Sequence, residues 1–387
     1  MNGYTQMFQR IWQMMIKEFI QILRDPRMRI VTFVTPCVQT LVIGYAVTTD
    51  VKDVAMAIYD LDNSLESREL VARFTHSHDA RGYPYFRVAE WIHHEAQVRD
   101  LLDRGTVTMV LRMNHGFGAD VRAGRTGQFQ AIVDGSDSNT AGIVLSYAGE
   151  IGAQYSAEIL TDRYARMQGA VRLPGQVDLE ARAWFNENLE SRNFYVPGVI
   201  VVVVSLVSLL LTSMAVVREK EIGTIEQIMV TPISPMEFVL GKTVPFALIG
   251  ILDVVVVTFV GVYWFQVPVR GSLLLLLVCS GLYLSTTLSA GLLISTISHT
   301  QQQAMMATFF FFFPAMLLSG FAFPIANMPL VVQWLTYLNP LRYFLVIIRG
   351  IFLKGTGVEI LWPDMLALGV MGLATLWVVS RRFHKTL

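Results

Sequence analysis

Long apolar runs, separated by short polar stretches, dominate the sequence outside one central region. A helix that crosses a bilayer needs about 20 mostly apolar residues. Six segments fit this requirement, namely Ile30–Thr48, Phe194–Val217, Thr243–Phe265, Ser272–Ile297, Ala304–Phe323 and Leu361–Val379. The pattern predicts an α-helical polytopic membrane protein with six transmembrane helices, the first at 30–49 and the other five within 194–387.

The central region has a different composition. Charged residues make up 16% of the whole chain, against about 25% in a typical soluble protein. Between Val51 and Arg192, however, there are 20 acidic and 15 basic residues, a density that suits a water-exposed domain. We therefore expect a polar domain at 50–193, inserted after the first span. The chain as a whole has no net charge, which gives no indication of a nucleic-acid partner.

Within the inserted domain, short runs of branched side chains predict strands, and longer amphipathic stretches predict helices. The predicted strands are Val54–Tyr59, Thr106–Leu111 and Phe129–Val133. Predicted helices begin at the capping-box spacing of Asn63–Glu66 and cover Ala89–Asp103 and Thr140–Met167. This mixture indicates an inserted α/β domain.

Basic residues flank the cytoplasmic ends of membrane helices. Arg27 and Arg29 precede the first predicted span, and Arg381 and Arg382 follow the last one. Both termini are therefore expected in the cytoplasm, and the domain at 50–193 is expected to be extracytoplasmic.

Residues 1–29 are too polar to span a membrane, but their apolar residues recur at helical spacing. This stripe contains Phe8, Ile11, Trp12, Met15, Phe19 and Ile22. It predicts an amphipathic helix, lying either on the inner membrane surface or against a cytosolic partner.

Several short stretches resemble chemical sites without completing one. Asp60-Leu-Asp62 resembles the start of a calcium loop, but the required Gly and Glu do not follow, so a strand end capped into a helix is favoured. Gly241-Lys242-Thr243 matches the end of a phosphate-binding loop, yet Met236 stands where that loop needs Gly. We expect no catalytic, cofactor or metal site in this chain, so any ATP and Mg must bind to another chain.

The segment 218–232 is a short polar stretch between two apolar runs. Ile222, Ile225 and Met229 would form one apolar stripe, with the glutamates off it, and Thr231-Pro232 would end the helix. The sequence predicts a cytoplasmic amphipathic helix held between two spans, where a push on it would tilt both spans.

These residues also carry a resemblance. Arg218–Glu226, Thr231-Pro232, Glu237 and Gly241-Lys242 resemble the signature loop of ABC-2 type transporter permeases. Four later stretches are similar to the family's segment before the last span, namely Leu318–Pro324, Asn327–Pro329, Asn339-Pro340 and Arg349-Gly350. With the predicted topology, the resemblance extends over nearly the whole chain, in the subgroup of bacterial drug-efflux permeases.

The resemblance implies a permease subunit of an ATP-binding-cassette exporter in the bacterial inner membrane. Its implied partners are a cytoplasmic ATPase subunit, which binds ATP and Mg, and a second permease, identical or paralogous. A periplasmic adaptor and an outer-membrane channel are further candidate partners, and membrane lipid surrounds the chain. The implied ATPase-coupling residues are Glu219, Glu221, Gly223, Thr224, Glu226, Thr231 and Pro232.

Three other features of the apolar region are candidate sites. Asp253 lies inside the third predicted span, as either a substrate, cation or proton site or a structural partner of another span. Phe309, Phe312 and Phe313 could line a cargo path or pack against lipid. The segment 321–353, broken by prolines, is predicted to re-enter the outer leaflet and could form an outer gate.

We therefore expect an exporter that moves amphipathic or hydrophobic, drug-like or lipid-like molecules out of the cytoplasm or inner leaflet, through a cleft built by the second and fifth spans. The alternative is a membrane sensor or assembly scaffold whose outer domain binds a ligand. A membrane enzyme would need a catalytic cluster, and we find no such pattern in the sequence.

Overall fold

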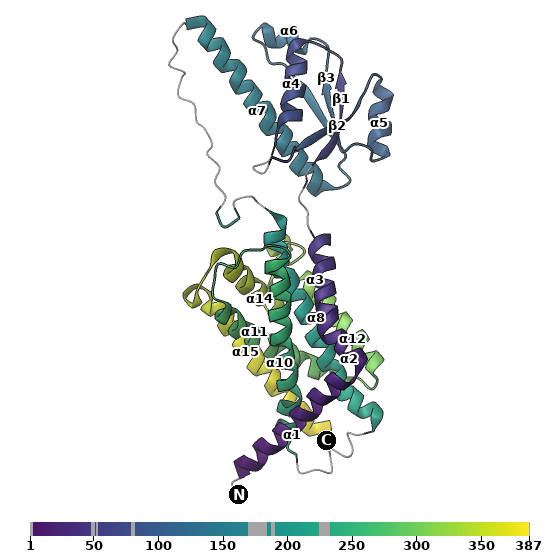
Figure 1. Cartoon of the computed structure of the whole chain (residues 1–387), viewed down its shortest axis with the longest axis vertical. Helices are drawn as coiled ribbons and strands as arrows, with labels where there is room; N and C mark the ends of the chain where they lie inside the picture. The colour runs from purple at the N-terminus through teal and green to yellow at the C-terminus, as the bar shows by residue number, and fades with distance from the viewer. Residues whose placement is uncertain are drawn as a thin grey trace. The chain divides into compact units, whose positions relative to one another are not determined.

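The computed structural model describes residues 3–47, 51, 53–78, 82–168, 184–186, 190–223 and 233–386 (Figure 1). The chain forms two compact units. One contains Met1–Thr48 and Ala183–Leu387 and is helical, and the other contains Thr49–Arg182 and holds a β-sheet.

The helical unit is an assembly of α-helices joined by short turns. Its N-terminal elements are α1 (Gly3–Arg24), α2 (Pro26–Arg29), the π-helical turn η1 (Ile30–Val34) and α3 (Thr35–Ala46). Its later elements are α8 (Ser191–Ile222), α10 (Pro235–Tyr263), α11 (Leu273–Ile297), α12 (Gln301–Leu317), η2 (Ile325–Asn327), α13 (Leu330–Thr336), α14 (Pro340–Arg349), η3 (Gly350–Lys354) and α15 (Val358–Thr386).

Four of the described helices are long and apolar enough to cross a membrane. They are Ser191–Ile222, Glu237–Tyr263, Leu273–Ile297 and Val358–Arg381, and they coincide with the second, third, fourth and sixth predicted spans. The first predicted span contains a shorter apolar helix, Ile30–Ala46, and the fifth contains α12, which has 17 residues. The total of six spans therefore stays a prediction.

The region before α15 contains a broken helix. Leu330–Thr336 and Pro340–Lys354 are apolar enough together to cross a membrane, but they bend by 79° at the break between them. Pro340 cannot donate a backbone hydrogen bond, which favours a break at this point. This geometry is either a broken span or the re-entrant segment that the prolines in 321–353 predict.

Helix α8 is the centre of the helical unit. Its most apolar window is 83% buried within the chain, whereas that of α15 is only 17% buried. Gly291 lets α11 approach α8 closely, because a Cβ at this position would lie 2.9 Å from Thr212 Cβ and 3.1 Å from the Leu209 carbonyl oxygen. Small residues are the usual means of such close helix packing in membrane proteins.

The second unit is a four-stranded sheet with helices on both faces (Figure 1). Its elements are β1 (Val54–Asp60), α4 (Leu65–His76), β2 (Phe86–Trp91), α5 (Glu95–Asp103), β3 (Met109–Met113), α6 (Phe117–Arg122), β4 (Phe129–Val133) and α7 (Ser138–Gln168). The strand order is β2-β1-β3-β4, with β1 parallel to both neighbours and β4 antiparallel to β3.

The central strands of this sheet are buried on both faces. Ile58 packs with Phe74 of α4 and Val144 of α7 on one face, while Ala57 packs with Val98 of α5 on the other. This burial explains why β1 is an almost continuous apolar run instead of an alternating one.

The prediction of a helix over Ala89–Asp103 was wrong at its start. Residues Phe86–Trp91 form the edge strand β2, and the helix begins only at Glu95. An edge strand buries few side chains, and Phe86 is the one residue of β2 that is fully buried. The alternation that marks a strand is therefore too weak to be recognised in the sequence.

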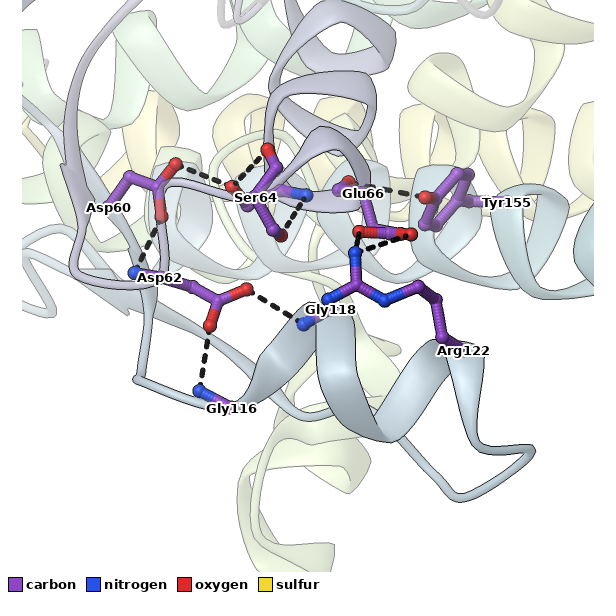
Figure 2. Close-up of polar contacts among 9 residues, drawn as sticks. Asp60, Asp62, Ser64, Glu66, Gly116, Gly118, Arg122 and Tyr155 are labelled. Atoms are coloured by element: carbon purple, nitrogen blue, oxygen red, sulfur yellow. Dashed lines mark hydrogen bonds and ion pairs between the residues drawn. The ribbon is translucent and has the colours of Figure 1, made fainter.

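The turn after β1 is held by carboxylates (Figure 2). Asp60 Oδ1 accepts hydrogen bonds from the backbone N–H groups of Asp62 and Asn63, at 3.0 and 2.9 Å. Ser64 then caps α4 by accepting a hydrogen bond from the Ser67 N–H at 3.2 Å. The expected strand end capped into a helix is confirmed, but the cap is Ser64 and not Asn63, with which the predicted capping box Asn63–Glu66 begins.

Asp62 joins this turn to α6. Its two carboxylate oxygens each accept a hydrogen bond of 2.7 Å, one from the Gly116 N–H and one from the Gly118 N–H (Figure 2). A Cβ at Gly118 would lie 2.4 Å from Ser64 Oγ, so only glycine lets the two segments approach this closely. The three residues Asp62, Gly116 and Gly118 form what we call the Asp62 clamp.

We predict that Asp62→Asn destabilises the sheet unit. The hydrogen bond that the Asp62 carboxylate accepts from the Ser64 hydroxyl, and then those from the Gly118 and Gly116 N–H groups, hold the pKa of Asp62 below its ordinary value of 3.8. A carboxylate with a lowered pKa stabilises the fold at neutral pH and loses this contribution as the pH falls through its folded-state pKa. Hydrogen exchange of the β1 amides in the full chain at pH 7 should show a loss of about 1–2 kcal/mol.

The matched control is Asp103→Asn, which removes an exposed carboxylate paired with Arg99 one helical turn away. Such surface pairs contribute about 0.5 kcal/mol or less. Equal exchange in the two variants at neutral pH would contradict a stabilising role for the clamp.

Candidate functional site

The described part of the predicted coupling helix is the last turn of α8. Residues 218–222 continue this helix without a break, and Gly223 ends it in a left-handed conformation with φ of 80°. Glycine is the usual residue at such a helix end, since it adopts positive φ without strain. The other predicted coupling residues, namely Thr224, Glu226, Thr231 and Pro232, lie outside the described residues.

Beside this helix end, a lysine is buried between two carboxylates. Lys242 Nζ lies 3.1 Å from Glu219 Oε1 of α8 and 2.8 Å from Glu18 Oε1 of α1. Lys17 of α1 completes the set, with its Nζ 2.6 Å from the same Glu219 oxygen. We call these four residues the Lys242 network.

Three members of the network are almost closed to solvent, whereas Lys17 is exposed. Lys242 is 1% exposed, and Glu18 and Glu219 are each 3% exposed. Two cations and two anions balance, and Lys242 Nζ also donates a hydrogen bond to the Ala215 carbonyl at 3.2 Å. Removing one partner from such a buried set leaves an uncompensated charge, which typically costs about 3–5 kcal/mol.

Further ion pairs hold α1 across the ends of α8 and α10. Arg218 of α8 pairs with Asp25 at 3.1 Å, and Arg10 of α1 lies 3.6 Å from Glu237 at the start of α10. Glu237 in turn forms a capping box with Ser234, accepting a hydrogen bond of 2.6 Å from the Ser234 N–H. These contacts make α1 a strap over the two helix ends that flank residues 224–232.

Close packing supports the strap. A Cβ at Gly241 would lie only 2.6 Å from the sulfur of Met14, so the glycine lets α1 rest directly on α10. Met14, Glu18 and Ile22 are the buried face of α1, whereas Phe8 and Trp12 are exposed. The predicted apolar stripe is therefore only partly the packing face of this helix.

The end of α8 also contacts the turn between α11 and α12. Glu221 accepts a hydrogen bond of 2.8 Å from the Gln301 N–H, and its other oxygen contacts the Gln301 side chain. Lys220 Nζ lies 3.3 Å from the carbonyl oxygens of Ser295 and Thr296, at the C-terminal end of α11. A positive charge at this end of a helix is stabilised by the helix dipole. The last turn of α8 therefore contacts four other helices, namely α1 and α10 through Glu219, α11 through Lys220 and α12 through Glu221.

Of the predicted coupling residues, the structure brings Glu219 into the Lys242 network and Glu221 onto Gln301. Glu219 is too buried to present its carboxylate to another protein, so it acts within the chain. Sequence reasoning missed Glu18 and the role of Lys242. The sequence does contain one sign that Glu18 is buried. It lies four residues from both Met14 and Ile22, so it is a charged residue within an apolar stripe.

A second candidate site is an apolar cavity of about 370 Å³. It lies among α8, α11, α12 and the break between α13 and α14. Its lining includes Leu209, Ala290, Phe310, Phe311, Phe312, Ala315, Leu318, Leu335, Leu338 and Leu341.

The few polar groups in the cavity already have partners. The hydroxyls of Ser205 and Tyr283 contact each other. Asn339 donates a hydrogen bond of 2.6 Å to the Ala315 carbonyl and accepts one of 3.1 Å from the Leu341 N–H. The surface of the cavity is therefore mainly apolar, and each of these polar side chains already has a hydrogen-bond partner.

The predicted cargo-path phenylalanines have different positions. Phe312 is buried and lines the cavity together with its neighbours Phe310 and Phe311. Phe309 and Phe313 do not line it, and their rings stack with centroids 5.8 Å apart. Of the three phenylalanines suggested by the sequence, Phe312 lines the cavity, and Phe310 and Phe311 take the place of Phe309 and Phe313.

Comparison with known proteins gives these features a context. The model of the family described as ABC-2 family transporter protein matches residues 26–381. Two relatives from Escherichia coli strain K12 are 32% identical, YbhR over 95% of this chain and 96% of its own length, and YbhS over 97% of each. Both are named probable multidrug ABC transporter permeases.

A third relative from the same strain, the inner membrane transport permease YhhJ, is 30% identical over 86% of this chain and 85% of its own length. The family model and these relatives cover the helical unit and the sheet unit together. They favour the permease hypothesis over the sensor hypothesis, and the chain belongs to the ABC-2 family of transporter proteins, as a membrane permease subunit.

Proposed function

We propose that the chain is the permease of an exporter that moves amphipathic or hydrophobic molecules out of the cytoplasm or inner leaflet. ATP and Mg²⁺ would bind in separate ATPase subunits. The observation that carries this proposal is the Lys242 network, because it joins the helix ends on both sides of residues 224–232. A force on that connection is therefore transmitted to α1, α8 and α10 as one body.

The arrangement of charges supports this transmission. A buried lysine with two carboxylates cannot separate from either partner without a large free-energy cost. Helices α8 and α10 are therefore expected to move together when the connection between them is pushed. Since α8 also lines the cavity through Ser205 and Leu209, its movement would change the cavity's shape.

The cavity supports the choice of cargo. A site lined by Leu, Phe and Ala favours apolar molecules through burial of their surface. The relatives YbhR and YbhS, named as multidrug permeases, make drug-like compounds the first candidates.

The expected membrane arrangement completes the proposal. Both termini and the Lys242 network would lie on the cytoplasmic side of the inner membrane, with residues 50–193 outside. A second permease, identical or paralogous, would complete the pathway. Phe310 and Phe311, which are 80% and 65% exposed, would then face the partner permease or lipid.

The direct test of the partnership is copurification. The tagged chain, extracted from its host in mild detergent, is expected to bring an ATP-hydrolysing subunit with it. An extract in which the chain is intact and monodisperse, but no ATPase accompanies it, would contradict the proposal.

We predict that Glu219→Gln uncouples ATP hydrolysis from cargo. Glutamine keeps the size of the side chain but removes the charge that Lys17 and Lys242 share. Cargo-stimulated ATP hydrolysis of the purified complex should fall about fivefold to hundredfold, the usual range of coupling between sites. The ATPase subunit should still copurify.

Glu221→Gln is the matched control, because this glutamate is exposed and bonds only to Gln301 among the contacts described for it. It should reduce stimulation much less than Glu219→Gln does. If cargo stimulates ATP hydrolysis in the Glu219 variant as strongly as in the wild type, the Lys242 network has no role in coupling.

We also predict that filling the cavity blocks cargo. Ala315→Phe adds a ring to its lining, and transport of an apolar dye from membrane vesicles should fall about tenfold, equivalent to roughly 1.4 kcal/mol. Met306→Phe on the exposed surface of the same helix should leave transport within about twofold of the wild type. Equal transport by the two variants would show that cargo does not use this cavity.

A further inference from the structure

A carboxyl group is buried inside the membrane-spanning part of α10. Asp253 lies within the span Glu237–Tyr263 and is only 2% exposed. Its Oδ2 atom has no hydrogen-bond partner in the described part of the chain. An ionised carboxylate in such a place would lack both water and a compensating charge, which is strongly unfavourable.

The surroundings of Asp253 are polar but uncharged. Helix α10 packs against α3 and α8, and the Cys37 thiol of α3 is near enough to interact electrostatically with the carboxyl. On α8, Ser208 packs near Gly250, one turn before Asp253, and its hydroxyl is also buried without a partner. Neither group can supply a positive charge.

The described side chains of the other elements that pack on α10 supply none either. The ion pairs of α1 with α8 and α10 lie near Lys242, eleven residues before Asp253, or about 16 Å along the helix. Arg192, at the other end of α8, pairs with Glu190. Element η1 and helix α11 contain no Asp, Glu, Lys, Arg or His, and the Tyr283 hydroxyl of α11 contacts Ser205.

Helix α3 contains no charged residue, and the described charges of α15 other than Glu359 are engaged elsewhere. Tyr45, the other titratable residue of α3, accepts a hydrogen bond from the Trp264 indole. In α15, Asp364 interacts with Arg342 and Arg381 lies over the Trp377 ring. Glu359, the remaining acidic residue of α15, lies in the first turn of this helix. As an acid it cannot compensate the charge of a second carboxylate.

A cation from a second permease is not a suitable partner, because the carboxyl is already covered by its own chain. A metal ion would need several oxygen, nitrogen or sulfur ligands. No group of three or more His, Cys, Asp or Glu residues that could hold one occurs in the described ranges. A proton is the remaining partner, since it needs only the carboxyl itself.

We infer that Asp253 is a proton-binding site within the spanning part of the permease. The carboxyl holds its proton while α3 and α8 cover it, and releases it, as carboxylate plus H⁺, when water reaches it. Element η1 marks where this cover can change, because π-helical turns within α-helices often occur at functional positions and η1 contacts α10.

A connection to transport follows only if the proposed function holds. Helix α10 carries Lys242 near its N-terminal end and Asp253 further along the same helix. Movement of the cytoplasmic connection would then alter the covering of the carboxyl, so the transport cycle would bind and release a proton. Protonation of Asp253 itself does not depend on the proposed function.

The test is labelling with dicyclohexylcarbodiimide, an apolar reagent that reacts with protonated carboxyl groups. The purified full chain is placed in lipid nanodiscs and labelled between pH 6 and pH 9, and each carboxyl is read by mass spectrometry. We expect Asp253 to be modified, with a rate that falls as the pH rises, by about tenfold for each unit above its titration point.

Three further arms make the result decisive. Asp253→Asn should abolish the label at this position, and Asp253→Glu should restore it. Asp364→Asn, which removes a half-buried carboxylate of α15, should leave labelling of Asp253 unchanged. Sodium ions at neutral pH should give no protection.

Two results would overturn the inference. Protection by sodium would assign the site to a metal cation instead of a proton. Absence of label on Asp253 at every pH, in a folded wild-type chain whose other carboxyls react, would show that the group is not protonated. Since labelling needs neither ATPase nor cargo, its failure is distinguishable from a failure of the proposed export function.

Discussion

The burial of Lys242 between Glu18 and Glu219 is the constraint on which the cytoplasmic end of the helical unit depends. A charge in this position is tolerable only if both carboxylates stay within a few ångströms of it. The ends of α1, α8 and α10 must therefore keep their mutual positions. The remaining contacts, from the Arg218–Asp25 pair to the packing of Met14 on Gly241, are consistent with this arrangement and reinforce it.

Apolar packing then extends this fixed end through the rest of the unit. Helix α8 is buried along most of its length, so its neighbours must follow its direction. Gly291 brings α11 against it, and the Ser205–Tyr283 contact joins the same two helices near the cavity. The cavity is therefore bounded on one side by the most constrained helix and on the other by α12, whose phenylalanines are largely exposed.

Hydrophobic pattern alone located four helices of spanning length, because a long uncharged run has few alternatives in a membrane. It did not reveal that Glu18 and Lys242 meet, since this pairing joins residues more than two hundred positions apart. It also placed a helix where the edge strand β2 lies, because a strand with one fully buried residue has almost no periodic signal. Local sequence patterns predicted most of the helices and strands, whereas contacts between charges distant in the sequence could be seen only in the three-dimensional structure.

The satisfied polar groups in the cavity have a consequence for selectivity. A binding site rejects a molecule strongly when that molecule leaves one of the site's own polar groups without a partner. Tyr283, Ser205 and Asn339 already have hydrogen-bond partners within the chain. A bound molecule without hydroxyl or amide groups therefore leaves none of these three side chains unpaired. Discrimination in this cavity must therefore come from size and shape, and chemically unrelated compounds of similar bulk would be nearly equivalent to it.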